Sequence, residues 1–517
     1  MKIENISNKK ILYAISSFIA GFVVMTIELI SNRIMAPLIG GSVFTWTSVI
    51  GVTLLGLAGG NFLGGIVADK KYSNVLPLTF LASGFFVVII PLLAEHTNFI
   101  LNSINSIMKL NLSLALYLFL LPTLSIGMIQ PIILKKFADD FTKIGSHYGI
   151  LSFTWSLGGI LGVFLTGFFF VSYLGTKETV WFMAGLLFIL GLVYGIRNKK
   201  ILFTFIGAGI MIIGLIYTAE KVTEHREVLF NKETNYYNAK VVDTYSSTYG
   251  SSRVLLLDFS AQSYEFQAPT EIYTDTYPLF SYLKKEINDI LVIGAGAYII
   301  PKHLVKYYPK SKVLVAELDP EVVNIGNNFF DLKKYNIETT IGDAKIVLKK
   351  SPQKYDVIFS DAYTSFISVP WYLLTKEWND EIKQKLNNDG IYAINLIGSL
   401  SGNKSEFIKS TLKTFQLSFP SSYVFAMGDN TENIQNIILV GIKGKLPMSE
   451  KKLYEKLLLD KSFLAKKLVK NEPLNNSRYT ILTNNFAPTE KLLEPIVKYY
   501  FPFNTKEINK ILKNSKT

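Results

Sequence analysis

Residues 290–298, Ile-Leu-Val-Ile-Gly-Ala-Gly-Ala-Tyr, decide the fold of the second half of this 517-residue chain. The apolar run at the start is typical of a strand that is buried on both faces of a sheet. Gly294 and Gly296 then allow a tight turn, in which the backbone comes close to a ligand at the N-terminus of a helix. The pattern predicts the first strand and turn of a nucleotide-binding α/β unit.

Short apolar runs continue downstream and alternate with stretches of helical spacing, such as 320–330 and 371–386. The predicted strands are Ile290–Ile293, Lys312–Ala316, Ile337–Ile341, Asp356–Ser360, Ile391–Asn395, Tyr423–Met427 and Ile437–Ile442. This alternation indicates an α/β doubly wound sheet, whose ligand binds beyond the carboxyl ends of the strands. Upstream, 236–243 and 253–258 flank a polar turn and predict a β-hairpin.

Polar residues follow four of these strands, at the edge where a ligand is expected. Glu317 comes about 20 residues after the glycines, where an acidic side chain accepts hydrogen bonds from ribose hydroxyls. Asp343 follows the third strand, where a carboxylate can bind an adenine amino group, and Asp361 follows the fourth. The residues expected to bind a nucleoside are Gly294, Gly296, Glu317, Asp319, Asp343 and Ala344. A dinucleotide-binding fold would explain the first two strand ends but not the others.

The composition indicates a membrane part in addition to this soluble part. A hydrophobic fraction of 49%, a charged fraction of only 18% and a mean hydropathy of +0.28 exclude a disordered chain, and they are too apolar for an ordinary soluble enzyme. The net charge of +13 lies largely beside apolar stretches, where charges anchor helices, so we expect no nucleic-acid partner. The chain has no cysteine and only scattered histidines, so we expect no metal site.

Seven apolar stretches are long enough to cross a bilayer. They lie near 11–31, 44–67, 75–94, 112–134, 148–171, 179–196 and 201–218. Lysine and arginine dominate alternate short loops and place the N-terminus on the cytoplasmic side of the cell membrane. With seven spans the second half would then lie outside the cell. Three alternatives stay open: the seventh stretch does not cross, a further span exists, or the second half is extracytoplasmic.

Two patterns suggest how these spans pack. Glycines recur every four residues at Gly56, Gly60 and Gly64 in the second span and at Gly158 and Gly162 in the fifth, a spacing that lets helix backbones approach closely. Phe-Thr-Trp-Thr at 44–47 is similar to Phe-Thr-Trp-Ser at 153–156. The similarity suggests that spans one to three and four to six are two triplets of opposite orientation, as in many transporters.

Glu28 and Arg33 are the functional candidates within the membrane part. A carboxylate inside a span is costly unless it is neutral or paired, so Glu28 marks either a substrate or proton site or a structural pair. Arg33, five residues further on, is its expected partner.

The motifs of the second half resemble the spermidine synthase family of aminopropyltransferases, over roughly 236–445. The matching motifs are Gly-Ala-Gly-Ala-Tyr at 294–298, Glu-Leu-Asp-Pro-Glu-Val-Val at 317–323, Gly-Asp-Ala at 342–344, Tyr-Asp-Val-Ile-Phe-Ser-Asp-Ala-Tyr at 355–363 and Leu-Asp-Phe-Ser-Ala-Gln-Ser at 257–263. Glu28, Arg33 and the glycine-rich second span resemble the subgroup in which a multispanning segment is fused ahead of this domain. The resemblance implies a transferase of polyamine biosynthesis with an S-adenosylmethionine-methyltransferase-like domain.

The resemblance also implies roles for individual residues. The donor would be decarboxylated S-adenosylmethionine, a co-substrate and not a permanently bound cofactor, held by the nucleoside-binding residues named above. Asp361 would be the catalytic carboxylate, because the attacking amine must first lose its proton. Gln262, Tyr273 and Tyr363 would line the side of the small-molecule amine, such as putrescine. The expected partners are this amine, the lipid bilayer and a second copy of the chain in a homodimer.

Three features depart from the family pattern. The family's acidic and histidine-containing segment after the hairpin is reduced here to Tyr-Thr-Asp-Thr-Tyr at 273–277. Ala297 stands where the family has the Asp that holds the donor's amine, and Thr364 stands where it has a second Asp for the polyamine. A second hypothesis is therefore a transferase that uses ordinary S-adenosylmethionine on another acceptor. A third is a polyamine transporter or sensor whose soluble domain does not catalyse.

We expect four regions: a transmembrane domain at 1–220, a linker with the hairpin subdomain at 221–285, the catalytic domain at 286–445 and a helical extension at 446–517.

Overall fold

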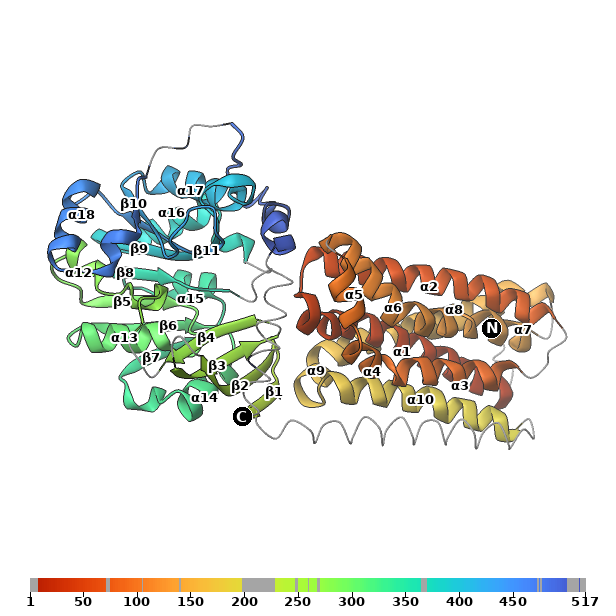
Figure 1. Cartoon of the computed structure of the whole chain (residues 1–517). Helices are drawn as coiled ribbons and strands as arrows, with labels where there is room; N and C mark the ends of the chain where they lie inside the picture. Colours follow the sequence, from red (N-terminus) through yellow and green to blue (C-terminus); the bar gives the residue numbers. More distant parts are fainter. Residues whose placement is uncertain are drawn as a thin grey trace. The chain divides into compact units, whose positions relative to one another are not determined.

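The computed structural model describes most of the chain, in ranges separated by short gaps. These are residues 8–70, 75–104, 106–138, 141–197, 228–246, 250–258, 260–266, 270–363, 370–471, 474, 477–499 and 511. The chain divides into two compact units, Met1–Arg226 and Glu227–Thr517, each described by itself below (Figure 1). The seventh predicted span, 201–218, lies outside the described residues.

The described part of the first unit is helical, which is the structure that satisfies backbone polar groups within a single segment in lipid. Its α-helices are α1 (Asn8–Ile39), α2 (Val43–Asp69), α3 (Val75–Val88), α4 (Ile90–Glu95), α5 (Asn98–Ser103), α6 (Ile107–Gly127), α7 (Ile129–Phe137), α8 (Ile144–Leu165), α9 (Val171–Tyr173) and α10 (Thr176–Arg197). By length and composition, six segments could cross a bilayer: α1, α2, α3 with α4, α6 with α7, Ile144–Tyr173, and α10. Each overlaps one of the first six predicted spans.

Helices α2 and α8 carry large apolar side chains on their surface. Leu54, Leu55 and Phe62 of α2, and Phe153 and Phe164 of α8, are all more than half exposed. Apolar surface of this extent is unfavourable in water but costs nothing against lipid tails. The exposed faces of both helices are therefore suited to a bilayer.

Glycines bring neighbouring helices of this unit close together. A Cβ atom added at Gly64 of α2 would lie 2.6 Å from the carbonyl oxygen of Met128, between α6 and α7. A Cβ atom added at Gly162 of α8 would lie 2.5 Å from the carbonyl oxygen of Phe22 in α1. No larger residue fits at either position, which confirms the close approach that the glycine spacing predicts. Such contacts provide dispersion attraction, the main source of helix association in lipid.

The similarity between 44–47 and 153–156 does not reflect equivalent positions. Thr45 lies in the first turn of α2, where it forms a capping box with Ser42: each backbone N–H donates to the other's hydroxyl at 3.3 Å. Thr154 lies in the interior of α8 and donates to the carbonyl oxygen of Leu151 at 3.0 Å. The two motifs therefore occupy different places in their helices.

We expect Gly64→Ala to destabilise the first unit, because the new methyl group would force α2 away from α6 and α7. Overpacking of this kind costs about 1–3 kcal/mol. Gly65→Ala is the matched control, since a Cβ atom there would meet nothing within 4 Å. Thermal unfolding of the detergent-purified protein measures both variants. Equal melting temperatures for the two would contradict the close contact.

The second unit begins with an antiparallel sheet of four strands in the order β1-β2-β3-β4. These are β1 (Val228–Glu233), β2 (Asn238–Ser246), β3 (Gly250–Leu257) and β4 (Ser260–Phe266). The two strands predicted as a hairpin correspond to β2 and β3, and β1 and β4 extend that pair on either side. In β4 the pairing passes from Ala261 to Ser263, so Gln262 is the extra residue of a β-bulge. Bulges re-aim side chains and are common beside active sites.

The main sheet of the second unit has eight strands in the order β12-β10-β11-β9-β8-β5-β6-β7. These are β5 (Asp289–Ile293), β6 (Lys312–Glu317), β7 (Ile337–Ile341), β8 (Tyr355–Ser360), β9 (Leu386–Gly398), β10 (Ser422–Ala426), β11 (Gln435–Ile442) and β12 (Leu468–Val469). The seven strands predicted from the sequence are all present. Strands β5 to β9 are parallel, and β11 pairs antiparallel with both β9 and β10, so the sheet is mixed.

The strand order places a ligand crevice at β5. From β5 the chain builds outward through β6 and β7 and then returns to add β8 on the other side. Such a switch point leaves a crevice at the carboxyl ends of the strands. The helices of this unit are α12 (Leu279–Leu283), α13 (Ile299–Tyr307), α14 (Pro320–Phe329), α15 (Ala344–Lys350), α16 (Lys376–Lys385), α17 (Glu406–Ser418) and α18 (Glu450–Leu459). The predicted helix 371–386 is shorter, because Thr375 caps α16 after a 3₁₀ turn.

Candidate active site

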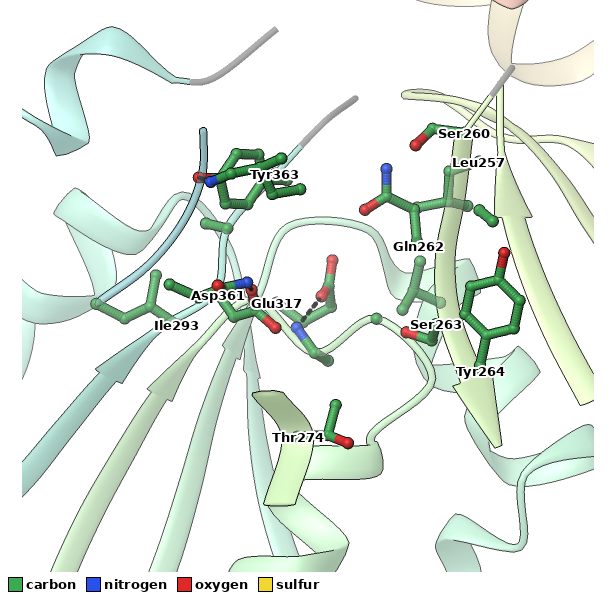
Figure 2. Close-up of a pocket in the computed structure, with 18 of the residues that line it drawn as sticks. Leu257, Ser260, Gln262, Ser263, Tyr264, Thr274, Ile293, Glu317, Asp361 and Tyr363 are labelled. Atoms are coloured by element: carbon green, nitrogen blue, oxygen red, sulfur yellow. Dashed lines mark hydrogen bonds between the residues drawn. The ribbon is translucent and has the colours of Figure 1, made fainter. Parts of the chain in front are cut away.

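A cavity of about 540 Å³ lies at the switch point, within the second unit. One wall consists of the turn after β5 and the ends of β6, β7 and β8, and the opposite wall consists of β4. Figure 2 shows Glu317 and Asp361 on the first wall and Gln262 and Ser263 on the second. The cavity brings together these predicted residues: Gly294, Gly296, Glu317, Asp343, Ala344, Asp361, Gln262, Tyr273 and Tyr363. Asp319 does not line it, and Glu28 and Arg33 belong to the other unit.

The turn after β5 requires its two glycines. Gly294 has φ +83° and Gly296 has φ +51°, in the left-handed region that glycine adopts at little cost. A Cβ atom at Gly294 would lie 2.7 Å from the carbonyl oxygen of Asp361, and one at Gly296 would overlap the hydroxyl oxygen of Ser263. That hydroxyl accepts a hydrogen bond from the backbone N–H of Ala297 at 3.0 Å. The turn is therefore packed directly between β4 and β8.

Glu317, at the end of β6, joins that strand to the glycine turn. Its Oε2 accepts from the backbone N–H of Ala295 at 2.9 Å, and its Oε1 accepts from that of Asp319 at 2.9 Å. The side chain is only 6% exposed, and this burial raises the pKa of its carboxyl group. Each oxygen retains a lone pair that can accept from a ligand.

Asp319 is a structural residue in this fold. Its Oδ1 accepts from the backbone N–H of Glu321 and caps α14, and its Oδ2 accepts from the hydroxyl of Thr234. The expected role in nucleoside binding is not supported by this position, because both oxygens face a helix end and the segment after β1. The adjacent Glu317 is the acidic residue that faces the cavity.

Asp343 combines a structural contact with a place in the cavity wall. Its Oδ1 caps α15 by accepting from the backbone N–H of Lys345 at 2.9 Å. Its Oδ2 accepts from the phenol of Tyr372 at 2.8 Å. Tyr372 also lines the cavity and was not predicted as a site residue. Together the two side chains form a polar edge next to Ala344.

Asp361 lies at the end of β8 and has two defined donors. Its Oδ1 accepts from the side-chain amide of Asn395 at 2.8 Å, and its Oδ2 accepts from the phenol of Tyr273 at 3.3 Å. Asn395 is in turn held by Asn436, whose amide donates to the Asn395 side-chain oxygen at 3.1 Å. Burial raises the pKa of Asp361 to about 6, although both hydrogen bonds oppose the shift. The carboxylate is therefore a base suited to neutral pH.

Tyrosines form much of the remaining wall. Tyr363 accepts from the backbone N–H of Ile397 at 3.0 Å, and burial raises the pKa of both Tyr363 and Tyr273, so both phenols stay neutral. The tyrosines that line the cavity are Tyr237, Tyr245, Tyr264, Tyr273, Tyr363 and Tyr372. Aromatic faces attract cations when water is excluded.

The charge of the cavity has one sign. Glu317, Asp343 and Asp361 line it, and the described lining residues include no lysine, arginine or histidine. The described residues also contain no cluster of His, Asp or Glu that could hold a metal ion. The arrangement suits an organic cation with hydrogen-bonding groups.

Sequence reasoning did not identify Ser263, Tyr372, Asn395 and Asn436. Asn395 had a detectable signal, because it is an amide within an otherwise apolar strand and is 2% exposed. A buried amide needs partners, so it predicts a polar contact across the sheet. The other three had no such signal, because their roles depend on neighbours distant in sequence.

The fold and the cavity define an α/β nucleoside-binding domain with an acidic, tyrosine-lined site. Residues 276–438 match the Spermine/spermidine synthase domain family. The second unit thus contains a spermine/spermidine synthase domain, as the motifs predicted.

Several known proteins are similar to larger or smaller parts of the chain. Polyamine aminopropyltransferase 2 of Aquifex aeolicus is 24% identical over 522 residues, covering 94% of this chain and 97% of that protein. The polyamine aminopropyltransferase of Oceanobacillus iheyensis is 24% identical over 413 residues, covering 74% and 77%. For a probable polyamine aminopropyl transferase of Bifidobacterium longum, 29% identical, the match spans 32% of that protein's length. A crystal structure of a probable spermidine synthase from Corynebacterium glutamicum aligns with a TM-score of 0.36 at 18% identity, covering 45% of this chain and 86% of the other.

We expect Gly296→Ala to destabilise the second unit by about 1–3 kcal/mol, because the added methyl group pushes β4 away from the turn. The double variant Gly296→Ala/Ser263→Ala should recover part of the stability, since only the Ser263 Cβ, at 3.8 Å, then faces the methyl group. Thermal unfolding of both variants and of Ser263→Ala alone measures this. An unchanged melting temperature in Gly296→Ala would contradict the packing.

Proposed function

We propose that the chain is a membrane-bound polyamine aminopropyltransferase. It transfers the aminopropyl group of decarboxylated S-adenosylmethionine to a small amine, of which the diamine putrescine is the first candidate. The observation that carries the proposal is the position of Asp361, a carboxylate with a raised pKa in an acidic cavity beside the glycine turn. The domain match and the similarity to polyamine aminopropyltransferases support the same reaction.

The donor would lie along the ends of β5, β6 and β7. The backbone of Gly294 and Gly296 permits its close approach, Glu317 accepts from the ribose hydroxyls, and Asp343 accepts from the adenine amino group. The decarboxylated donor carries a sulfonium and an ammonium group, whereas ordinary S-adenosylmethionine carries a carboxylate as well. That carboxylate would lie among three acidic side chains, with no described cationic residue in the wall to receive it. The charge of the cavity thus favours the decarboxylated donor.

Asp361 would act as the proton acceptor for the attacking amine. An ammonium ion has no lone pair, so the amine must lose a proton before its nitrogen can bond to the carbon next to sulfur. The carbon–sulfur bond then breaks, its electron pair stays on sulfur, and the sulfonium leaves as a neutral thioether. Asn395 and Tyr273 hold both oxygens of Asp361, which keeps the carboxylate oriented toward the reacting amine.

We further propose that the first unit is a multi-pass domain of the cell membrane. Six segments have the required length and composition, and the apolar faces of α2 and α8 are exposed. If six spans cross, the positively charged loops place the second unit in the cytoplasm, where a cytosolic donor would be accessible. A homodimer stays a prediction of the family resemblance.

A product assay by mass spectrometry tests the proposed reaction. Detergent-purified protein is offered decarboxylated or ordinary S-adenosylmethionine together with putrescine and other amines. We expect an aminopropylated amine with the decarboxylated donor, and a loss of at least about 100-fold in rate for Asp361→Asn. Asp429→Asn, which changes a fully exposed carboxylate, is the control. Alkylation by ordinary S-adenosylmethionine alone, or no product from a folded protein, would contradict the proposal.

The rate at saturating substrates should fall on the acid side of about pH 6. Protonation of Asp361 removes the proton acceptor, so the rate drops about tenfold for each further pH unit. Asn395→Leu removes a hydrogen bond that lowers the pKa of Asp361, so the acid limb should move to higher pH. Initial rates between pH 5 and 9 measure the shift. A limb that stays in place or moves to lower pH in this variant would count against Asp361 as the base.

A further inference from the structure

The close glycine contacts of the first unit occur in matching pairs. In the α1–α8 pair, a Cβ atom at Gly162 would lie 2.5 Å from the carbonyl oxygen of Phe22. In the pair of α2 with α6 and α7, a Cβ atom at Gly64 would lie 2.6 Å from the carbonyl oxygen of Met128. Met128 lies 106 positions after Phe22, and Gly162 lies 98 positions after Gly64.

The same two offsets relate the other contacts of these helices. Gly158 contacts the carbonyl group of Phe18, and Gly60 contacts that of Leu124. Leu124 again lies 106 positions after Phe18, and Gly158 lies 98 positions after Gly60. Gly21 meets the backbone of Trp155, and Gly127 meets that of Leu57, which repeats both offsets a third time. Gly56 and Gly159 form close contacts without a glycine counterpart.

The pair formed by α3 and α10 contains its own match. A Cβ atom at Gly84 of α3 would lie 3.0 Å from the ring of Phe188 in α10. A Cβ atom at Gly191 of α10 would lie 2.7 Å from the side chain of Leu81 in α3. Gly191 lies 107 positions after Gly84, and Phe188 lies 107 positions after Leu81. The repeat therefore maps the α3–α10 contact onto itself, as expected for two helices related by a two-fold axis.

The helix directions show that the repeat is inverted. Between α1 and α8, and between α2 and α6, the residue numbers of the contacts rise together along both helices, so each of these pairs is parallel. Between α3 and α10 the numbers rise along one helix and fall along the other, so this pair is antiparallel. The offsets relate α1 to α6–α7, α2 to α8, and α3 to α10. Because successive spans alternate in direction, each helix of the first triplet runs opposite to its counterpart in the second. A two-fold axis in the membrane plane relates such triplets. The sequence similarity of 44–47 and 153–156 would relate α2 to α8 with an offset of 109, but the contacts relate these helices with an offset of 98. The sequence similarity therefore does not mark the equivalent positions of the repeat.

Unpartnered acceptor atoms lie within the helices of this bundle. The hydroxyl oxygen of Thr53 on α2 and the side-chain oxygen of Asn111 on α6 are buried and have no hydrogen-bond partner. These two helices pack together and belong to different triplets. A buried polar atom without a hydrogen-bond partner is costly, so these positions favour a polar ligand or water within the bundle.

Glu28 adds a charge that the repeat does not share. Its counterpart at an offset of 106 is Leu134. Arg33, the expected partner, lies five residues further on and therefore on a different face of the helix. A half-buried carboxylate in an apolar bundle needs a proton or a cation.

We propose that the first unit is an inverted-repeat carrier that binds a protonated amine through Glu28. The proposal rests on membrane insertion of this unit and not on catalysis by the second. Inverted repeats give two related packings of the triplets, open to opposite sides of the membrane, with the substrate held between them. The carboxylate of Glu28 suits an ammonium group, which has one positive charge and three donors.

Uptake by proteoliposomes tests the carrier. Vesicles containing the full chain are offered radiolabelled putrescine and spermidine, and we expect uptake above that of protein-free vesicles and at least a tenfold loss in Glu28→Gln. Glu95→Gln, at the end of α4 beside Lys177, should keep wild-type uptake. Asp361→Asn should also keep it, which separates transport from the proposed transferase. No uptake by the wild type, equal uptake by Glu28→Gln, or Glu28-dependent proton flux without amine uptake would overturn the proposal.

Cysteine labelling tests the inverted arrangement, because the chain has no cysteine of its own. An inverted repeat puts the starts of α1 and α6 on opposite sides of the membrane. In intact cells a membrane-impermeant maleimide should label Ser106→Cys, before α6, and not Asn8→Cys, at the start of α1. Both should react after permeabilisation. Labelling of both variants in intact cells would overturn the repeat.

Discussion

The burial of the Asp361 carboxylate is the constraint on which the site of the second unit depends. A carboxylate in this position is costly, and its pKa rises to about 6, because little water reaches it. Asn395 on β9 and Tyr273 from the segment after the small sheet compensate in part by donating to its two oxygens. Asn436 on β11 fixes the Asn395 amide, so the antiparallel pairing of β11 with β9 also contributes. Four segments distant in sequence thus converge on one carboxylate.

Close backbone approach plays a comparable part in both units, for different physical reasons. In the second unit the turn after β5 must pass between Asp361 and Ser263, which leaves no room for a side chain at Gly294 or Gly296. In the first unit the glycines bring helix backbones into direct contact, and such contact is the source of attraction between helices that lie in lipid. Glycine is required in each case because a single Cβ atom would remove the contact.

Local patterns accounted for much of the architecture. The seven strands, six long apolar helical segments and the glycine turn were predicted because each depends on the period or size of neighbouring residues. The site was predicted in outline, since strand ends meet at one edge of a parallel sheet. Asp319 was expected at the ligand but caps α14, because one position decides whether a carboxylate faces the crevice or caps the following helix. Arg33, the partner expected for Glu28, lies on another face of α1.

By itself the sequence determined the apolar helical character of the first half, the α/β class of the second half and the carboxylates at the strand ends. These follow from hydrophobic period and residue chemistry, which are local properties. Only the tertiary structure decided that Asn395, Asn436 and Tyr273 surround Asp361 and that the cavity wall is acidic without a described cation. It also decided that the close contacts of α1, α2 and α3 match those of α6–α7, α8 and α10. The physical reason is that hydrogen bonds and helix contacts join residues far apart in the chain, and their partners are set by packing.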